Sequence, residues 1–282
     1  MEPLTVGNRI FDFKRPYIVG ILNITPDSFS DGGEHASPEK AASRCLEMVE
    51  EGADMIDIGG ESTRPSSRSV SAEEELERVL PVIRLIRKKT DIPVSVDTTK
   101  ASVAEAAVGE GADLVNDISG LRFDPAMART AARLEVPIVL MHSRKAPSDM
   151  QKDVHYDDLF GEVSAELSEA IRAAQDAGVP GSCIIVDPGI GFAKTAQHNV
   201  RILGDVGFLA SLGKPVMVGP SRKSFIGAYT GAEVHDRLGG TAAAVTAAVL
   251  GGAHFLRVHD VKVMKQAAMI AFSMRDCNME KA

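Results

Sequence analysis

The chain has 282 residues, of which 44% are hydrophobic and 25% are charged, and its formal net charge is -8 at pH 7. These fractions are ordinary for a soluble globular protein. The acidic balance argues against a general nucleic-acid-binding surface, which needs a basic stripe. A local anion site built from Arg, Lys and His is still compatible with it.

The cysteines and the apolar stretches bear on cellular location. Three cysteines occur, too widely spaced for a metal or disulfide pattern: Cys45, Cys183 and Cys277. A reducing compartment therefore fits, and we expect Cys183, which lies in an apolar run, to be buried. The first apolar run is too short for a signal peptide, and the longest, residues 242–250, is too short to span a membrane. We therefore expect a cytoplasmic protein without a membrane partner.

In chain order, residues 1–16 predict a short lead-in, with a hairpin across the floor of the fold as one form of it. Eight short apolar runs follow, each separated from the next by enough residues for a helix: 17–22, 55–58, 94–96, 114–118, 137–141, 183–186, 215–218 and 254–258. Alternating strands and helices indicate an α/β fold with a parallel sheet, and eight units favour a closed (β/α)8 TIM barrel forming one domain over residues 1–282. An open doubly wound sheet is the competitor, but the first run lacks the glycine-rich phosphate turn of that fold.

The boundaries of these elements have local signals. Three glycines are placed to end a helix in the left-handed conformation before a strand: Gly52, Gly111 and Gly252. Three prolines are placed to open a strand: Pro93, Pro137 and Pro215. Apolar residues at a 3.6 period predict a helix over residues 71–89, with Ser71 and Glu74 as a capping box. Residues 156–177 predict another long helix.

Nearly every predicted strand ends in a side chain able to bind a ligand or take part in chemistry. These are Asn23, Glu61 with Thr63 and Arg64, Asp97, Asn116, His142, Asp187, Ser221 with Lys223, and Arg257 with His259. Because a barrel gathers its active site at the carboxyl ends of its strands, we expect them to share one pocket. Taken singly, several of them have a simpler explanation. Asn23 suits a turn, Asp97 could cap a helix near Lys100, and Arg257 could pair with a carboxylate inside the barrel.

The residue types indicate what the pocket would bind. Asp97, Asn116 and Asp187 together suit the donor and acceptor edge of a flat, nitrogen-rich ring. Arg64, Arg257 and His259 suit a diphosphate, and barrels often bind phosphate after their last two strands. The loops around residues 25–33 and 62–67 are placed to act as lids that exclude water.

The strand-end motifs resemble those of the dihydropteroate synthases, a family of pterin-binding TIM barrels in folate biosynthesis. The matching stretches are residues 20–33 (GILNITPDSFSDGG), 57–65 (DIGGESTRP), 95–98 (SVDT), 115–118 (VNDI), 140–142 (LMH), 187–194 (DPGIGFAK), 219–227 (GPSRKSFIG) and 257–261 (RVHDV). The resemblance implies a transferase that condenses 6-hydroxymethyl-7,8-dihydropterin diphosphate with p-aminobenzoate. Diphosphate would leave first, and the amine would then attack the resulting cation.

The resemblance also implies roles for individual residues. The pterin would be held by Asp97, Asn116, Asp187 and Lys223, with Ile118 and Met141 against its ring. The diphosphate would contact Asn23, Thr63, Arg257 and His259, and Asn23 would help to bind Mg²⁺. The p-aminobenzoate side would consist of Arg64, Pro65, Phe192, Ser221 and Lys223. Within this set Lys223, Asp97, Asp187, Arg257 and His259 would be catalytic. Inhibition by sulfonamides and a homodimer are further expectations.

The sequence departs from the family pattern in two loops. Ser66 and Ser67 follow the Arg-Pro of the second loop, where the family often has glycine. After His142 the chain continues Ser143-Arg144-Lys145-Ala146-Pro147, where the family often has methionine and a glycine-containing turn. Both departures concern loop mobility and inhibitor fit more than the reaction.

Three other functions compete with the synthase. A pterin-dependent corrinoid methyltransferase would use the same ring contacts but has no use for a diphosphate site. A Schiff-base lyase would use Lys223 as a nucleophile, which requires a lowered lysine pKa. A binding protein with a degenerate site is the third.

Overall fold

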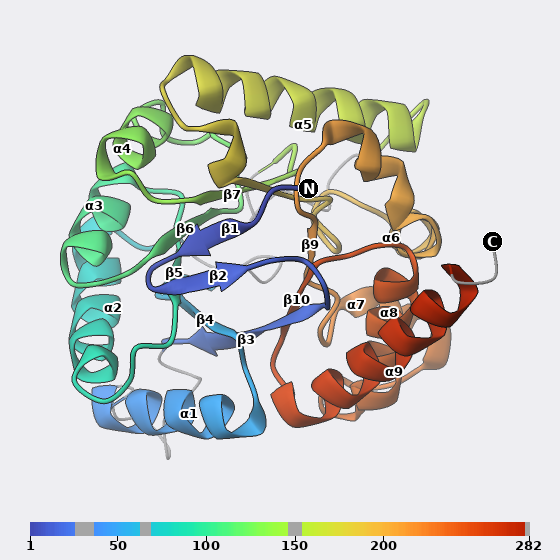
Figure 1. Cartoon of the computed structure of the whole chain (residues 1–282), viewed down its shortest axis with the longest axis horizontal. Coiled ribbons are helices and arrows are strands. Elements are labelled where there is room, and N and C mark those ends of the chain that lie inside the picture. Colours follow the sequence, from blue (N-terminus) through green and yellow to red (C-terminus); the bar gives the residue numbers. More distant parts are fainter. Residues whose placement is uncertain (26–36, 63–68, 146–153, 280–282) are drawn as a thin grey trace.

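The computed structural model describes residues 1–25, 37–62, 69–145 and 154–279, and its central feature is a parallel eight-stranded sheet. The strands run in the order β8-β7-β6-β5-β4-β3-β10-β9, and a bridge between Val186 and Val216 joins the two edges. The predicted barrel is therefore confirmed (Figure 1). Its strands are β3 Tyr17–Asn23, β4 Met55–Gly59, β5 Val94–Asp97, β6 Leu114–Asp117, β7 Ile138–Met141, β8 Ile184–Asp187, β9 Met217–Val218 and β10 Phe255–Val258.

Helices surround the sheet, as Figure 1 shows. They are α1 Pro38–Glu51, α2 Ala72–Arg87, α3 Ala101–Gly109, α4 Met127–Leu134, α5 Leu159–Asp176, α6 Ala196–Gly204, α7 Ser224–Thr230, α8 Leu238–Leu250 and α9 Val261–Met279, with short 3₁₀ turns η1 Gly181–Cys183, η2 Val206–Leu212 and η3 Val234–Asp236. Gly52, Gly111 and Gly252 have φ angles near +100°, as predicted for the helix-to-strand turns. None of the helices in the described part of the chain combines the length and apolar character needed to cross a membrane.

Some predicted boundaries were wrong, for local reasons. Ser71 Oγ accepts the Glu74 backbone N–H at 3.2 Å, but the Glu74 side chain pairs with Arg78, so only half of the expected capping box forms. The second long helix begins at Leu159 rather than at residue 156, because the Asp158 side chain caps it at the Gly161 N–H. Cys183 is half-buried in the η1 turn and precedes β8, where we expected a buried strand residue.

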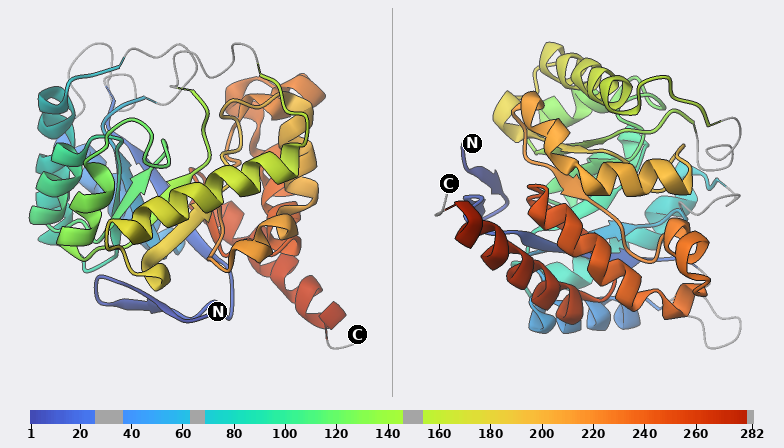
Figure 2. Two further views of the ribbon diagram at one scale, coloured as in Figure 1. Left: turned by 90° about the horizontal axis from the view of Figure 1, so that it is seen from above. Right: turned by 90° about the vertical axis from the view of Figure 1, so that its right-hand side faces the viewer.

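The lead-in is a hairpin of β1 Leu4–Val6 and β2 Arg9–Phe11 that closes the amino-terminal end of the barrel (Figure 2, left). Leu4, Val6 and Phe11 are buried in it. They pack on a layer of apolar side chains from the strand starts: Val19, Met55, Leu114, Val139, Ile185, Met217 and Phe255. Full burial of such a side chain contributes roughly 1.5–3 kcal/mol. The hairpin therefore covers the amino-terminal end of the barrel and does not reach the carboxyl-terminal end.

The apolar floor layer also explains where the polar side chains of the strands lie. Side chains two positions apart on a strand share a face. On β6, Leu114 lies in the floor layer and Asn116 stands above it; on β10, Phe255 lies in the floor layer and Arg257 stands above it. An apolar floor therefore supports a polar layer at the carboxyl end of the barrel.

Candidate active site

A pocket of about 330 Å³, including its opening, lies at the carboxyl ends of the strands. It is lined by Asp97, Asn116, Ile118, Met141, Asp187, Ile190, Phe192, Gly219, Lys223 and Arg257. All of these except Ile190 and Gly219 were assigned to the site from the sequence. The lining mixes apolar walls with a few polar groups, as ligand pockets generally do.

Arg257 occupies the centre of the polar layer, held between two carboxylates. Its Nε donates to Asp57 Oδ2 at 2.5 Å and its Nη2 donates to Asp97 Oδ2 at 2.6 Å. Burial disfavours the charged guanidinium, but Asp57 and Asp97 outweigh that effect and raise the Arg257 pKa. The structure therefore confirms the simpler explanation considered for Arg257, that it pairs with carboxylates inside the barrel. Only 15% of its side chain is exposed.

Asp57 was not assigned a role from the sequence, although it begins one of the quoted motifs. It is buried, and its Oδ2 also accepts the Asn116 side-chain N–H at 3.1 Å. Because β4 and β6 flank β5, Asp57 reaches Asn116 across the barrel interior. Three polar residues of the layer are thereby linked: Asp57, Asn116 and Arg257.

Asp97 and Asp187 are both buried acids. Burial raises the pKa of Asp97 to about 7; Arg257 opposes this rise, and Asp57 adds to it. Burial also raises the pKa of Asp187 to about 6, against a hydrogen bond of 2.7 Å that its Oδ1 accepts from the Gly189 N–H. Asp97 does not cap α3. At that helix start Asp124 Oδ2 accepts the Ala101 N–H instead.

Lys223 faces Phe192 across the pocket. Its Nζ lies 4.2 Å from the centre of the Phe192 ring, which is a cation–π distance. Burial and the nearby Arg257 lower the Lys223 pKa to about 8. The lysine stem passes over Gly191, where a Cβ would lie 2.9 Å from Lys223 Cδ and where φ is +85°. Glycine at residue 191 therefore leaves room for the lysine.

Ser221 and His259 form a pair beside Arg257. Ser221 Oγ accepts the His259 backbone N–H at 3.2 Å and lies 2.9 Å from His259 Nδ1. Burial, Arg222 and Arg257 lower the pKa of His259 to about 3, so the ring is neutral at pH 7. When the Ser221 hydroxyl donates to Nδ1, the ring proton lies on Nε2, and that N–H is a neutral donor.

Five of the described residues expected at the strand ends do not line the pocket: Asn23, Glu61, His142, Ser221 and His259. His142 is buried, and it points outward because its neighbour Met141 faces the pocket; Lys194 Nζ contacts its Nδ1 at 2.9 Å. Glu61 pairs with Lys100, which also contacts Glu75 at 2.6 Å. Lys194 was a further residue without an assigned role, and its position as the last residue of the 187–194 motif was the available signal.

Asn23 ends β3, and its Oδ1 borders the same space over Gly59 as Asp97 Oδ2. Among the described residues, no three His, Cys, Asp or Glu side chains come together in a way that could hold a metal ion. Thr63, Arg64 and Pro65, together with residues 26–33, 66 and 67, lie outside the described residues. The expected anion contact of Thr63, the aromatic-side contacts of Arg64 and Pro65, and both lids therefore remain predictions.

Comparisons with known proteins identify the family. Residues 19–259 match the model of a family described as pterin binding enzymes. The chain belongs to the pterin-binding enzyme family. It is 49% identical over 271 residues to the dihydropteroate synthase of Synechocystis sp., covering 95% of this chain and 94% of that protein. The Bacillus subtilis dihydropteroate synthase is 45% identical over 261 residues, covering 93% and 89% of the two chains.

Solved members of this pterin-binding family superpose closely on the structure. Dihydropteroate synthase from Xanthomonas albilineans, solved with 4-aminobenzoic acid, has a TM-score of 0.90 and 44% identity, covering 97% of this chain and 98% of that one. The same enzyme in complex with 7,8-dihydropteroate has a TM-score of 0.87, 42% identity and the same coverage. The Yersinia pestis enzyme, solved as a sulfonamide drug complex, has a TM-score of 0.92 and 39% identity, covering 97% and 99% of the two chains.

Proposed function

We propose that this chain is a dihydropteroate synthase, a transferase that joins 6-hydroxymethyl-7,8-dihydropterin diphosphate to p-aminobenzoate and releases diphosphate. The observation that carries the proposal is the pocket itself. It places the buried acids Asp97 and Asp187 and the amide of Asn116 beside the cations of Lys223 and Arg257. The full-length similarity to dihydropteroate synthases supports the same assignment.

The pterin fits the acidic and amide side of the pocket. Carboxylates accept N–H groups from an aminopyrimidinone edge, and the Asn116 amide can donate and accept. Ile118 and Met141 are buried apolar side chains that suit the two faces of a flat ring. Asp97 and Asp187, when ionised, favour a pterin that carries positive charge.

The diphosphate fits Arg257 on β10 and His259, which directly follows the end of that strand. Arg257 is permanently charged, and His259 offers a neutral N–H. These donors stabilise the negative charge that grows on the leaving diphosphate as the C–O bond breaks. Because the electron pair leaves with the diphosphate, the pterin methylene carbon becomes cationic.

Magnesium is proposed as the cofactor on chemical grounds. Mg²⁺ is usually held by one or two protein oxygens, several waters and the phosphates of the substrate, so an all-protein cage is not required. The side-chain oxygen of Asn23 fits that role at the edge of the polar layer. When bound, the metal supplies further neutralisation of the leaving diphosphate.

The amine of p-aminobenzoate then attacks the methylene carbon and forms the new C–N bond, and the proton that the amine loses passes to solvent after the cation has been consumed. Phe192, Ser221 and Lys223 are proposed for this second substrate, together with Arg64 and Pro65. No serine or cysteine nucleophile is needed. Water has to be excluded because it would trap the cation, and we assign that role to the loops around residues 25–33 and 62–67.

The decisive experiment measures diphosphate release and dihydropteroate formation from the two substrates with Mg²⁺. Both should occur in the unmodified protein and be lost in Lys223→Ala and Arg257→Ala. Pterin binding without diphosphate release would instead favour the corrinoid methyltransferase or a non-catalytic pterin-binding protein. Borohydride trapping of a carbonyl substrate on Lys223 would favour the Schiff-base lyase, for which the lowered Lys223 pKa is the one supporting observation.

Sulfonamide inhibition, a homodimer and a cytoplasmic location complete the proposal. A solved relative with a sulfonamide drug supports the first. Apolar side chains exposed on α8 and α9 support the second: Leu238, Leu250, Ile270 and Met274. All three cysteines lie within the described residues as free thiols, which supports a reducing compartment. Sedimentation equilibrium would test the homodimer.

A further inference from the structure

The segment between β8 and α6 carries two pocket residues, Ile190 and Phe192, on an unusual backbone. Its φ angles are positive at Gly189, Gly191 and Ala193, with values of 70°, 85° and 46°. The last of these is disfavoured for a residue with a Cβ. A conformation of this kind persists only where the surrounding structure holds it.

Four side chains hold this segment through its main chain. Asp187 and Asn199 accept the N–H groups of Gly189 and Gly191, each at 2.7 Å. Lys194 Nζ donates to the Phe192 carbonyl at 3.1 Å, and the Tyr156 hydroxyl donates to the Ala193 carbonyl at 2.9 Å. Phe192 is therefore fixed through its own carbonyl and the next one along the chain.

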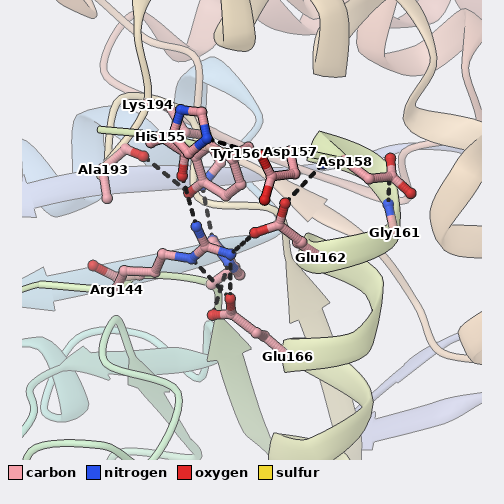
Figure 3. A network of polar contacts seen from close by, with 12 residues as sticks. Arg144, His155, Tyr156, Asp157, Asp158, Gly161, Glu162, Glu166, Ala193 and Lys194 are labelled. Atoms are coloured by element: carbon pink, nitrogen blue, oxygen red, sulfur yellow. Dashed lines mark hydrogen bonds and ion pairs between the residues drawn. The ribbon is translucent and has the colours of Figure 1, made fainter. Parts of the chain in front are cut away.

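Tyr156 is itself held in place by Arg144. Figure 3 shows the Tyr156 hydroxyl directed at Ala193, with the Arg144 guanidinium close to the ring. The guanidinium carbon lies 4.0 Å from the ring centre, and Arg144 pairs with Glu166 at 2.6 Å and with Glu162. Burial raises the Tyr156 pKa to about 12, so the phenol keeps the proton that it donates. Arg144 belongs to the stretch in which the sequence departs from the family pattern.

Lys194 gives a second support on the other side of the segment. It is buried, and its Nζ contacts His142 Nδ1 at 2.9 Å. His142 Nε2 in turn faces Glu166 at 3.2 Å, without the alignment of a hydrogen bond. Burial and Lys194 lower the His142 pKa to about 4, so its ring is neutral and accepts from Lys194. Glu166 on α5 therefore lies behind both supports, since it pairs with Arg144 at the Tyr156 ring and faces His142 beside Lys194.

We infer that Tyr156 and Lys194 are positioning residues for Phe192 and, through its ring, for the aromatic second substrate. The inference rests on the proposed function. Neither side chain lines the pocket, so each acts through the main chain of the segment. The Phe192 ring lies against Lys223 Nζ, and a shift of that ring changes the wall offered to p-aminobenzoate. Asn116 and Met141, which are proposed to contact the pterin, come from β6 and β7 rather than from this segment. Asp187, also proposed for the pterin, binds the segment at the Gly189 N–H, a hydrogen bond in which neither Tyr156 nor Lys194 takes part.

The test is steady-state kinetics of Tyr156→Phe, which removes one hydroxyl and keeps the ring under Arg144. Loss of one hydrogen bond should raise the KM for p-aminobenzoate by about threefold to tenfold. We expect kcat and the KM for the pterin diphosphate to change by less than about twofold on the same scale. Tyr229→Phe is the matched control, because Tyr229 is 60% exposed on α7, and it should leave both KM values unchanged.

A second variant, Arg144→Met, keeps the Tyr156 hydroxyl but removes the cation above its ring. It should raise the KM for p-aminobenzoate in the same direction and by a smaller factor. An unchanged KM for p-aminobenzoate in both variants would overturn the inference, as would an equal rise in the KM of both substrates, which indicates general loosening. An unmodified protein that forms no dihydropteroate would overturn the proposed function instead.

Discussion

Arg257 Nη2 donates to the carboxylate of Asp97 at 2.6 Å, although the two residues lie 160 positions apart in the chain. The pair links β10 to β5 across the barrel interior, and Asp57 binds the same guanidinium from β4. The cation proposed for the diphosphate therefore also binds two buried acids. Its removal should affect both stability and catalysis.

Arg257→Met should lower the free energy of unfolding by about 3–5 kcal/mol at pH 8, because it removes the cation that binds two buried carboxylates. The pKa of Asp97 is already raised by burial, and loss of Arg257 raises it further. A raised carboxyl pKa disfavours the folded state as pH rises, so the deficit should shrink toward pH 5. Denaturant unfolding at both pH values measures this. The control is Arg172→Met at an exposed position of α5, and an equal deficit at both pH values would contradict the argument.

The pH dependence of kcat/KM should be bell-shaped. Activity requires ionised Asp97, with a pKa of about 7, and protonated Lys223, with a pKa of about 8. The rate should therefore rise through about pH 7 and fall above about pH 8. In Lys223→Arg the residual activity should lose the alkaline limb, because a guanidinium stays protonated. An alkaline limb that remains in that variant would assign it to another group.

Phe192→Leu should raise the KM for p-aminobenzoate by severalfold. The change removes the ring that faces Lys223 Nζ at 4.2 Å, and such cation–π contacts contribute about 0.5–2 kcal/mol. Phe123→Leu is the control, because Phe123 is 41% exposed. Initial rates against p-aminobenzoate at saturating pterin diphosphate measure the effect. Equal KM values in the two variants would exclude Phe192 from the second-substrate site.

Removal of Mg²⁺ with a chelator should abolish diphosphate release, and added Mg²⁺ should restore it. Asn23→Ala should raise the Mg²⁺ concentration needed for half-maximal rate, since it removes a proposed oxygen ligand. Titration of the rate against free Mg²⁺ gives both results. Full activity in the presence of excess chelator would remove the metal from the proposal.

Arg222 tests the balance between backbone strain and a surface ion pair. Its φ is +57°, and its side chain pairs with Asp260 at 2.6 Å while 42% exposed. Arg222→Ala keeps the strain and loses the pair, so it should cost about 1 kcal/mol or less, in line with exposed pairs. Arg222→Gly also loses the pair but relieves strain of about 1 kcal/mol, so its Tm should lie above that of the alanine variant. Thermal unfolding of the two variants measures this difference. A Tm for Arg222→Gly below that of Arg222→Ala would contradict the argument from backbone strain.

The sequence alone determined the repeating elements and the polar strand ends. Gly52, Gly111 and Gly252 marked helix ends through their backbone freedom, which is a local property. The apolar runs marked the strands, and period-two alternation placed Asn116 above Leu114. Motif resemblance then assigned most of the residues that line the pocket.

Only the tertiary structure decided which charged groups meet. Asp57 pairs with Arg257 across 200 positions, and Lys194 contacts His142 across 52, and neither contact has a local signal in the chain. His142 ended a predicted strand like the pocket residues, yet it points outward because strand faces alternate and Met141 takes the inner face. The pKa values of Asp97 and Lys223 likewise depend on burial and on distant partners. Electrostatic partners are set by barrel closure, which brings remote strand ends within a few ångströms, whereas sequence patterns report only on neighbours along the chain.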